Sequence, residues 1–222
     1  MSEAQEEWFE TVQVGEKRIP HVSKFLRKDF TVSRESIEER WSLWTHKEKL
    51  RFVAAFSAKG QLNDADQRLL DFLMENGDWQ ISNAIALSVV NHRDRNRAVT
   101  FLLQMLKEER KPLANYYQAL EILRAAECVP DLKAAFLKHR AEIDQHPTLE
   151  TWGDRFIYLD YLSCSATLFT VTGEEEYRSN LIRMLEHPDE AIKKMTRMVA
   201  STSGIAIELD DRAGPRDHGS VF

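Results

Sequence analysis

The stretch Met184-Leu185-Glu186-His187-Pro188-Asp189-Glu190-Ala191-Ile192-Lys193 joins two segments of helical periodicity and decides the fold of this chain. Apolar residues recur at helical spacing on both sides of it, and Pro188 stands where one helix has ended and the next begins. Leu185, near the end of the first segment, precedes Ile192, which opens the second, by 7 residues. The stretch therefore predicts a helical hairpin, with helices near residues 175–186 and 189–202.

The same arrangement recurs toward the N-terminus, where further helix pairs follow one another. A period near 30 residues that is built from helix pairs is typical of stacked helical repeats. Residues 144–150 lengthen the last gap, and we interpret them as a loop inserted before the second helix of the fourth pair. The leucines that set this register are Leu43, Leu73, Leu106, Leu137 and Leu185, separated by 30, 33, 31 and 48 residues.

Helix start and stop signals delimit these pairs. Thr45 followed by Glu48 predicts a capping box, Asn63 precedes an acidic first turn, and Gly173 is placed to end a helix in the left-handed conformation. Strict alternation of apolar and polar residues is nearly missing after residue 33. These signals predict an all-α array over residues 33–202, with further helices near 34–44, 46–59, 64–76, 79–91, 94–109, 112–126, 130–144 and 151–171.

The two ends of the chain lack the repeat register. Residues 1–32 contain two stretches of helical pattern, near 3–12 and 20–29, so we expect an N-terminal helical cap on the first hairpin. Residues 203–222 carry glycine, proline and mixed charge without lasting periodicity, which predicts an irregular C-terminal tail.

Two of the segments resemble the HEAT repeat family of helical hairpins. Residues 50–55, Leu-Arg-Phe-Val-Ala-Ala, are similar to the family's second helix, Val-Arg-x-x-Ala-Ala, and residues 184–193 are similar to its turn. The resemblance covers about residues 34–202 and implies a right-handed α-solenoid of about five hairpins. Ser82 and Ala114 stand where the family usually has Arg, so its ladder of Asp and Arg side chains is largely missing. Tetratricopeptide repeats are the alternative solenoid, favoured by the Tyr-Tyr-Gln-Ala-Leu sequence of residues 116–120.

Composition limits the partners and the compartment. Among the 222 residues are only 8 Gly and 6 Pro, which favours helices, and the formal net charge of −6 disfavours a protein that coats nucleic acid or anionic lipid. The most apolar stretch, residues 156–171, contains Asp160 and is shorter than the roughly 20 residues of a spanning helix. The N-terminus shows no signal-peptide pattern, and the two cysteines suggest no disulfide framework. We therefore expect a soluble, cytoplasmic protein without membrane contact.

The titratable residues do not form the usual patterns of catalysis. The 7 histidines show no His-x-x-x-His spacing, and the sequence contains neither a glycine-rich phosphate loop nor a G-x-S-x-G elbow. We therefore expect no catalytic residue, no metal and no cofactor. The alternative is a DNA-binding protein or a HEAT-like alkylpurine DNA glycosylase, a family that lines a groove with tryptophans and an aspartate, here Trp152 and Asp154. We expect most of the tryptophans to pack between helices instead.

The predicted binding surface lies on the second helix of each pair. In HEAT-like arrays these helices line the concave side, where polar and amphipathic side chains can point away from the stacked core. Tyr158 and Arg197 are the expected anchors by residue type. The sequence thus predicts a non-catalytic scaffold that binds a peptide or protein, not nucleic acid, through Asn83, Gln118, Tyr158 and Arg197.

Overall fold

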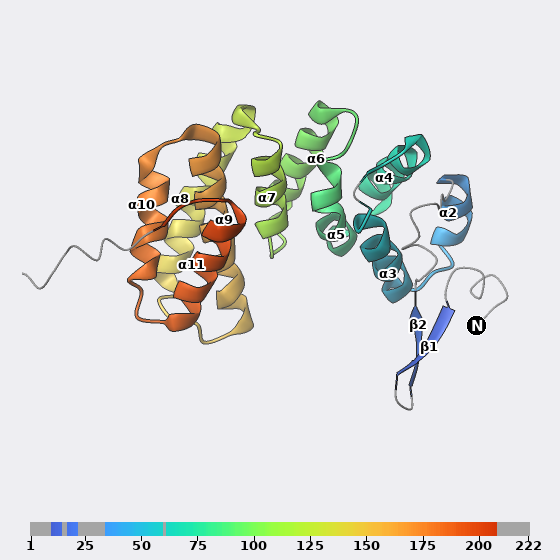
Figure 1. Ribbon diagram of the computed structural model, residues 1–222, viewed down its shortest axis with the longest axis horizontal. Coiled ribbons are helices and arrows are strands. Elements are labelled where there is room, and N and C mark those ends of the chain that lie inside the picture. The colour runs from blue at the N-terminus through green and yellow to red at the C-terminus, as the bar shows by residue number, and fades with distance from the viewer. Residues whose placement is uncertain (1–9, 15–16, 22–33, 60, 208–222) are drawn as a thin grey trace, which may run out of the picture. The chain divides into compact units, whose positions relative to one another are not determined.

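The computed structural model describes residues 10–14, 17–21, 34–59 and 61–207. They belong to two compact units, unit 1 up to Ala125 and unit 2 from Ala126 onward. Figure 1 shows the elements of each unit, coloured from blue at the N-terminus to red at the C-terminus. Every described regular element after residue 33 is helical, which confirms the all-α prediction for this part of the chain.

A two-stranded hairpin occupies the described part of the N-terminal segment. Strand β1 (Glu10–Val14) pairs antiparallel with β2 (Lys17–His21), with Val14 opposite Lys17. The helices predicted near residues 3–12 and 20–29 are wrong where they overlap these strands. β1 has alternating residue types and is rich in β-branched side chains, and both features favour an extended backbone over a helix. The rest of the predicted cap lies outside the described residues.

The helices of unit 1 start where the sequence signals place them. Thr45 accepts a hydrogen bond from the Glu48 N–H (3.3 Å), and the Glu48 carboxylate accepts one from the Thr45 N–H (2.8 Å), which completes the predicted capping box. Asn63 caps the next helix through the Asp66 N–H (2.9 Å). The helices are α2 (Arg34–Trp41), α3 (His46–Ser57), α4 (Asp64–Asn76), α5 (Trp79–Val89), α6 (Arg95–Glu108) and α7 (Ala114–Ile122).

These helices pack in a regular pattern. Second helices contact one another, α3 against α5 and α5 against α7, while the first helix α2 contacts α4. Within the hairpins, α4 contacts α5 and α6 contacts α7, as Figure 1 shows. At the N-terminal end of the layer, the rings of Trp41 and Phe72 meet edge to face at 5.6 Å, and Trp44 lies 5.3 Å from Phe52. Both tryptophans are buried, as predicted for packing residues.

Unit 2 is organised around one helix. α9 (Trp152–Thr172) contacts α8 (Val129–Gln145), α10 (Glu175–Leu185) and α11 (Glu190–Thr202), and its residues 160–168 are all buried. Gly173 ends α9 with φ +71°, in the left-handed conformation that the sequence predicts. The predicted inserted loop separates α8 from α9, beginning at His146.

The leucine register is not one uniform core position. Leu73 and Leu185 are buried and Leu106 is half-buried, whereas Leu43 and Leu137 are 72% and 64% exposed. The leucine spacing therefore locates the hairpins along the chain without marking the side chains that fill their cores.

The described C-terminal end closes onto α11. The Ile205 N–H donates to the Ala200 carbonyl (2.8 Å), and the Ile205 side chain is buried. Of the predicted irregular tail, residues 208–222 lie outside the described part of the chain. None of the described helices combines the length and the apolar character needed to cross a bilayer.

Candidate functional site

The four predicted binding residues fall into two sets. Asn83 on α5 and Gln118 on α7 belong to unit 1, and Tyr158 on α9 and Arg197 on α11 belong to unit 2. All four lie on second helices, but the structure does not gather them into one described site.

Asn83 links two neighbouring second helices. Its Nδ2 donates to the Pro112 carbonyl (2.8 Å), and its Oδ1 accepts a hydrogen bond from Asn115 Nδ2 (2.6 Å). The Ser57 hydroxyl makes a comparable link, donating to the Ala84 carbonyl on α5 at 2.9 Å. Asn83 thus has a structural role that its polar character alone did not reveal.

Gln118 lies on an outward face that repeats along unit 1. Its side chain is half-buried and makes no hydrogen bond within the described part of the chain. Four residues further on, Ile122 is 55% exposed, and the matching α5 residue, Leu87, is 39% exposed. The matching α3 residue, Ala54, is also exposed.

The three second helices share one exposure pattern, in which residue i+7 is exposed and residues i and i+3 are exposed or half-buried. The spacing i, i+3, i+7 places side chains on one face of a helix. We name this face of unit 1 the second-helix strip, and it consists of Lys47, Leu50 and Ala54 on α3, Gln80, Asn83 and Leu87 on α5, and Asn115, Gln118 and Ile122 on α7. Corresponding residues are 33 and 35 positions apart, so the repeat that the leucines only approximate is clearer in this face.

Sequence reasoning missed the apolar part of the strip. Leu87 and Ile122 lie among other apolar residues of α5 and α7. The sequence alone therefore assigns their side chains to the core. The signal that could have found them is their common spacing with Ala54.

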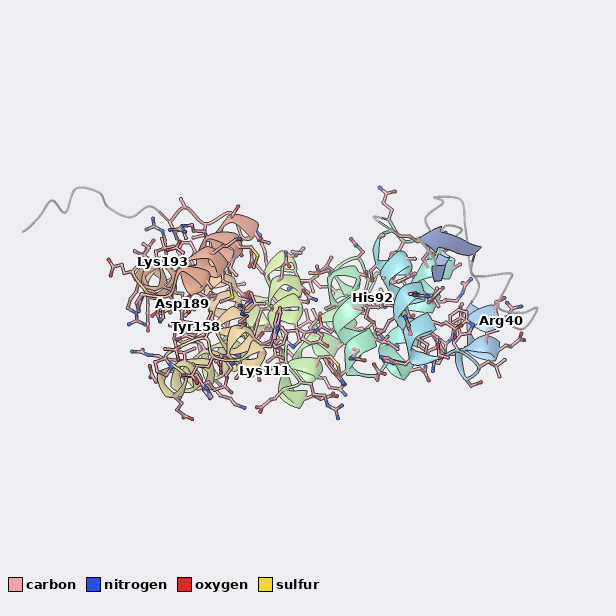
Figure 2. All side chains as sticks on the ribbon, turned by 90° about the horizontal axis from the view of Figure 1, so that it is seen from below. Arg40, His92, Lys111, Tyr158, Asp189 and Lys193 are labelled. Carbon is pink, nitrogen blue, oxygen red and sulfur yellow. The ribbon has the colours of Figure 1, made fainter. Side chains whose placement is uncertain are left out.

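Tyr158 is not an accessible anchor. Its side chain is 2% exposed, its hydroxyl donates to the His146 carbonyl (3.1 Å), and its ring meets His187 edge to face at 5.7 Å. Burial and then the charge of Asp189 raise the pKa of Tyr158. Figure 2 shows Tyr158 beside Asp189, at the turn before α11. Tyr158 therefore joins the inserted loop to the α10–α11 turn, which corrects the surface role predicted for it.

Arg197 has the exposure expected of a binding residue. Its Nη1 lies 3.1 Å from Glu190 Oε1, and Lys193 approaches the other oxygen of that carboxylate at 3.2 Å. Hydrogen bonds from Arg197 and Lys193 lower the pKa of Glu190. Met198 beside it is 53% exposed. A surface ion pair of this kind is weak, so Arg197 can exchange Glu190 for an acidic partner group at little cost.

Asp154, the carboxylate of the glycosylase alternative, is used in capping α9. Its Oδ2 accepts hydrogen bonds from the Thr151 N–H (2.6 Å) and the Thr151 hydroxyl (2.9 Å), and its Oδ1 lies 3.1 Å from His146 Nδ1. The Thr151 hydrogen bonds lower the pKa of Asp154. This geometry accounts for Asp154 without chemistry on a substrate.

A buried charge cluster in unit 1 has the residue types of an active site but a structural geometry. His92 Nε2 lies 3.0 Å from Asp71 Oδ1, and His92 Nδ1 lies 2.9 Å from the carbonyl oxygen of Asp94. Arg97 Nη1 reaches the same Asp71 oxygen at 3.1 Å. Figure 2 shows the position of His92. Because both ring nitrogens already have partners, His92 is poorly placed to take a proton from a substrate.

The described residues contain no group of three or more His, Cys, Asp or Glu side chains placed to hold a metal ion. Comparison with known proteins adds no identity, since no family model, no curated protein and no solved structure matches the chain.

Proposed function

We propose that this chain is a non-catalytic interaction scaffold, built as a HEAT-like right-handed α-solenoid, that binds a peptide or protein along the second-helix strip. The observation that carries the proposal is the face repeated on α3, α5 and α7, in which the same position of each helix holds an exposed apolar residue, Ala54, Leu87 and Ile122. Stacked hairpins explain such a repeat, because each contacts only its neighbours and leaves the same face outward. The contacts of α3 with α5 and of α5 with α7 support this arrangement.

The spacing of the strip defines the kind of peptide that fits it. Packed helices lie about 8–10 Å apart, so Ala54, Leu87 and Ile122 offer apolar contacts at about that interval. A polyproline II segment has three residues per turn and rises about 3.1 Å per residue, so every third side chain recurs after about 9 Å. The fitting ligand is therefore an extended segment with an apolar residue at every third position.

The polar members of the strip suit the backbone of such a ligand. An extended segment without internal hydrogen bonds exposes its N–H and carbonyl groups. The Gln118 amide supplies both a donor and an acceptor beside Ile122, so it can satisfy a ligand carbonyl and a ligand N–H together. Leu87 and Ile122 then supply most of the binding energy, and Gln118 fixes the ligand register.

A random dodecapeptide library displayed on phage tests the proposal. Selection on the full chain should enrich peptides with apolar residues three positions apart, and a Leu87→Glu/Ile122→Glu variant should bind a selected synthetic peptide at least about 10-fold more weakly, since charges would replace both apolar contacts. Leu43→Glu is the matched control, because Leu43 is 72% exposed and lies outside the strip. Equal binding by the strip variant and the wild-type chain would contradict the proposal.

A further inference from the structure

Trp152 is the one large aromatic side chain that is strongly exposed among the described residues. It is 72% exposed at the first position of α9, directly after the inserted loop. Its ring contacts Phe156 at 6.3 Å, and Phe156 is itself half-buried. Trp41 and Trp44 by contrast are 9% and 5% exposed, so Trp152 does not share the packing role of those tryptophans.

The ring already holds one cation. The Arg155 guanidinium carbon lies 4.9 Å from the Trp152 ring centroid, a cation–π distance, so Arg155 covers one side of the indole. The high exposure of Trp152 leaves much of the remaining ring surface to solvent. Exposed tryptophans with adjacent apolar contacts are typical anchors of protein interfaces.

The charged residues next to Trp152 in the sequence are mostly acidic. The exposed Asp144 and Glu150 precede it and Asp154, which caps α9, follows it, against Arg155 and His146. The C-terminal end of α8 also lies in this region and has no basic residue in its last turn. The partial negative charge of that helix end is therefore not offset by a cation from its own last turn, whereas Asp154 in the first turn of α9 offsets the partial positive charge of the helix start at Trp152.

We propose that the surface formed by Leu149, Glu150, Trp152 and Phe156 binds a cationic segment of a partner protein, in which an arginine or lysine lies beside an apolar residue. The cation stacks on the exposed side of Trp152 and pairs with Glu150, and the apolar side chain covers Leu149 and Phe156. The acidic surroundings repel phosphate groups, so charge complementarity favours a basic peptide over nucleic acid. This surface lies in unit 2 and does not depend on the second-helix strip.

Hydrogen bonds fix the inserted loop at both ends. Tyr158 fixes the loop by donating to the His146 carbonyl (3.1 Å), and Thr151 with Asp154 closes the capping box next to Trp152. Both ends of the loop that carries Leu149 and Glu150 are thus fixed, at His146 and at Thr151, so the position of Trp152 is set before a partner binds.

The test is a nuclear magnetic resonance titration of the full chain with a nonapeptide that alternates arginine and leucine. The Trp152 indole signal is assigned by its loss in Trp152→Phe. We expect that signal to shift saturably, and we expect Trp152→Ala and Glu150→Lys each to weaken binding at least about 10-fold. Leu87→Glu should leave this binding unchanged, which separates it from the function proposed for unit 1.

Two controls make the result specific. Leu137→Ala removes another exposed apolar residue of unit 2, 64% exposed on α8, and should have no effect. The same peptide with glutamate in place of arginine should not bind. The proposal is overturned if the arginine peptide fails to shift the indole signal, if the glutamate peptide shifts it equally, or if decathymidylate binds there in place of the peptide.

Discussion

In unit 1 polar side chains link one hairpin to the next, whereas in unit 2 three helices pack on α9, whose residues 160–168 are buried. The links of unit 1 include Asn83 with Pro112 (2.8 Å) and His92 with Asp71 (3.0 Å). In unit 2 the rings of Phe136 and Tyr161 stack at 5.3 Å, and Phe136 meets Tyr177 at 5.2 Å. Similar helix pairs are thus stabilised in two ways, by repeated polar links or by one shared apolar centre.

The two modes differ in what a single substitution can remove. Each polar link of unit 1 is one of several similar links. A substitution that removes one of them therefore mainly destabilises the boundary between two hairpins. A side chain at a shared centre contacts several helices, so its loss affects them together.

Tyr161→Ala should give the largest effect and would break the centre of unit 2. Tyr161 is fully buried, stacks on Phe136 and donates from its hydroxyl to Asn180 Oδ1 at 3.3 Å. We expect the free energy of unfolding to fall by about 3–5 kcal/mol, through lost burial and a cavity. Urea denaturation followed by circular dichroism measures it, with Leu137→Ala as an exposed control that changes it by less than about 0.5 kcal/mol. A loss below about 1 kcal/mol for Tyr161→Ala would contradict the central role of α9.

Asp71→Ala should have an intermediate effect on unit 1. Removing this carboxylate takes the acceptor from His92 Nε2 and from Arg97 Nη1, both about 3 Å away. The side chain of His92 is 1% exposed, so the loss leaves a buried polar group unpaired, which costs about 1–3 kcal/mol. Asp64→Ala, in the first turn of the same helix, is the exposed control. A cycle with His92→Ala should show coupling, and strict additivity of the two losses would show that the buried contact contributes nothing.

The difference in stability between Asn83→Ala and Gln118→Ala should be the smallest of these effects. It tests whether Asn83 links two hairpins while Gln118 is free to bind a ligand. Asn83 makes two hydrogen bonds between hairpins, so its loss should reduce the free energy of unfolding by about 1 kcal/mol. Gln118→Ala should leave stability within about 0.5 kcal/mol, since Gln118 makes no such bond in the described part of the chain. Equal losses for the two variants would remove the structural distinction between them.

The sequence predicted the helices because their local signals agree with their packing. The capping box of Thr45 with Glu48 and the helix end at Gly173 depend on residues close together in the chain, so both could be identified without tertiary information. The hairpin of β1 and β2 was missed because strands this short give a periodic signal that a helical pattern can imitate.

The candidate site was harder to predict because exposure depends on contacts between distant residues. Tyr158 and Arg197 both sit on second helices, yet one is buried under the inserted loop and the other faces solvent. An amphipathic residue gives the same sequence signal in either place. Leu87 and Ile122 show the opposite error. Their apolar side chains predict burial, yet both are exposed.

The burial of α9 also determines how slowly its backbone amides meet solvent. Between Asp160 and Leu168 the helix is covered by neighbours that all pack on it, so deuterium reaches these amides only after a neighbouring helix has moved away. Openings that expose a central element require nearly the free energy of unfolding the whole unit. Within unit 2 we therefore expect the slowest amide exchange along residues 160–168 of α9. Exchange should be faster at the exposed C-terminal end of α11, residues 201–202.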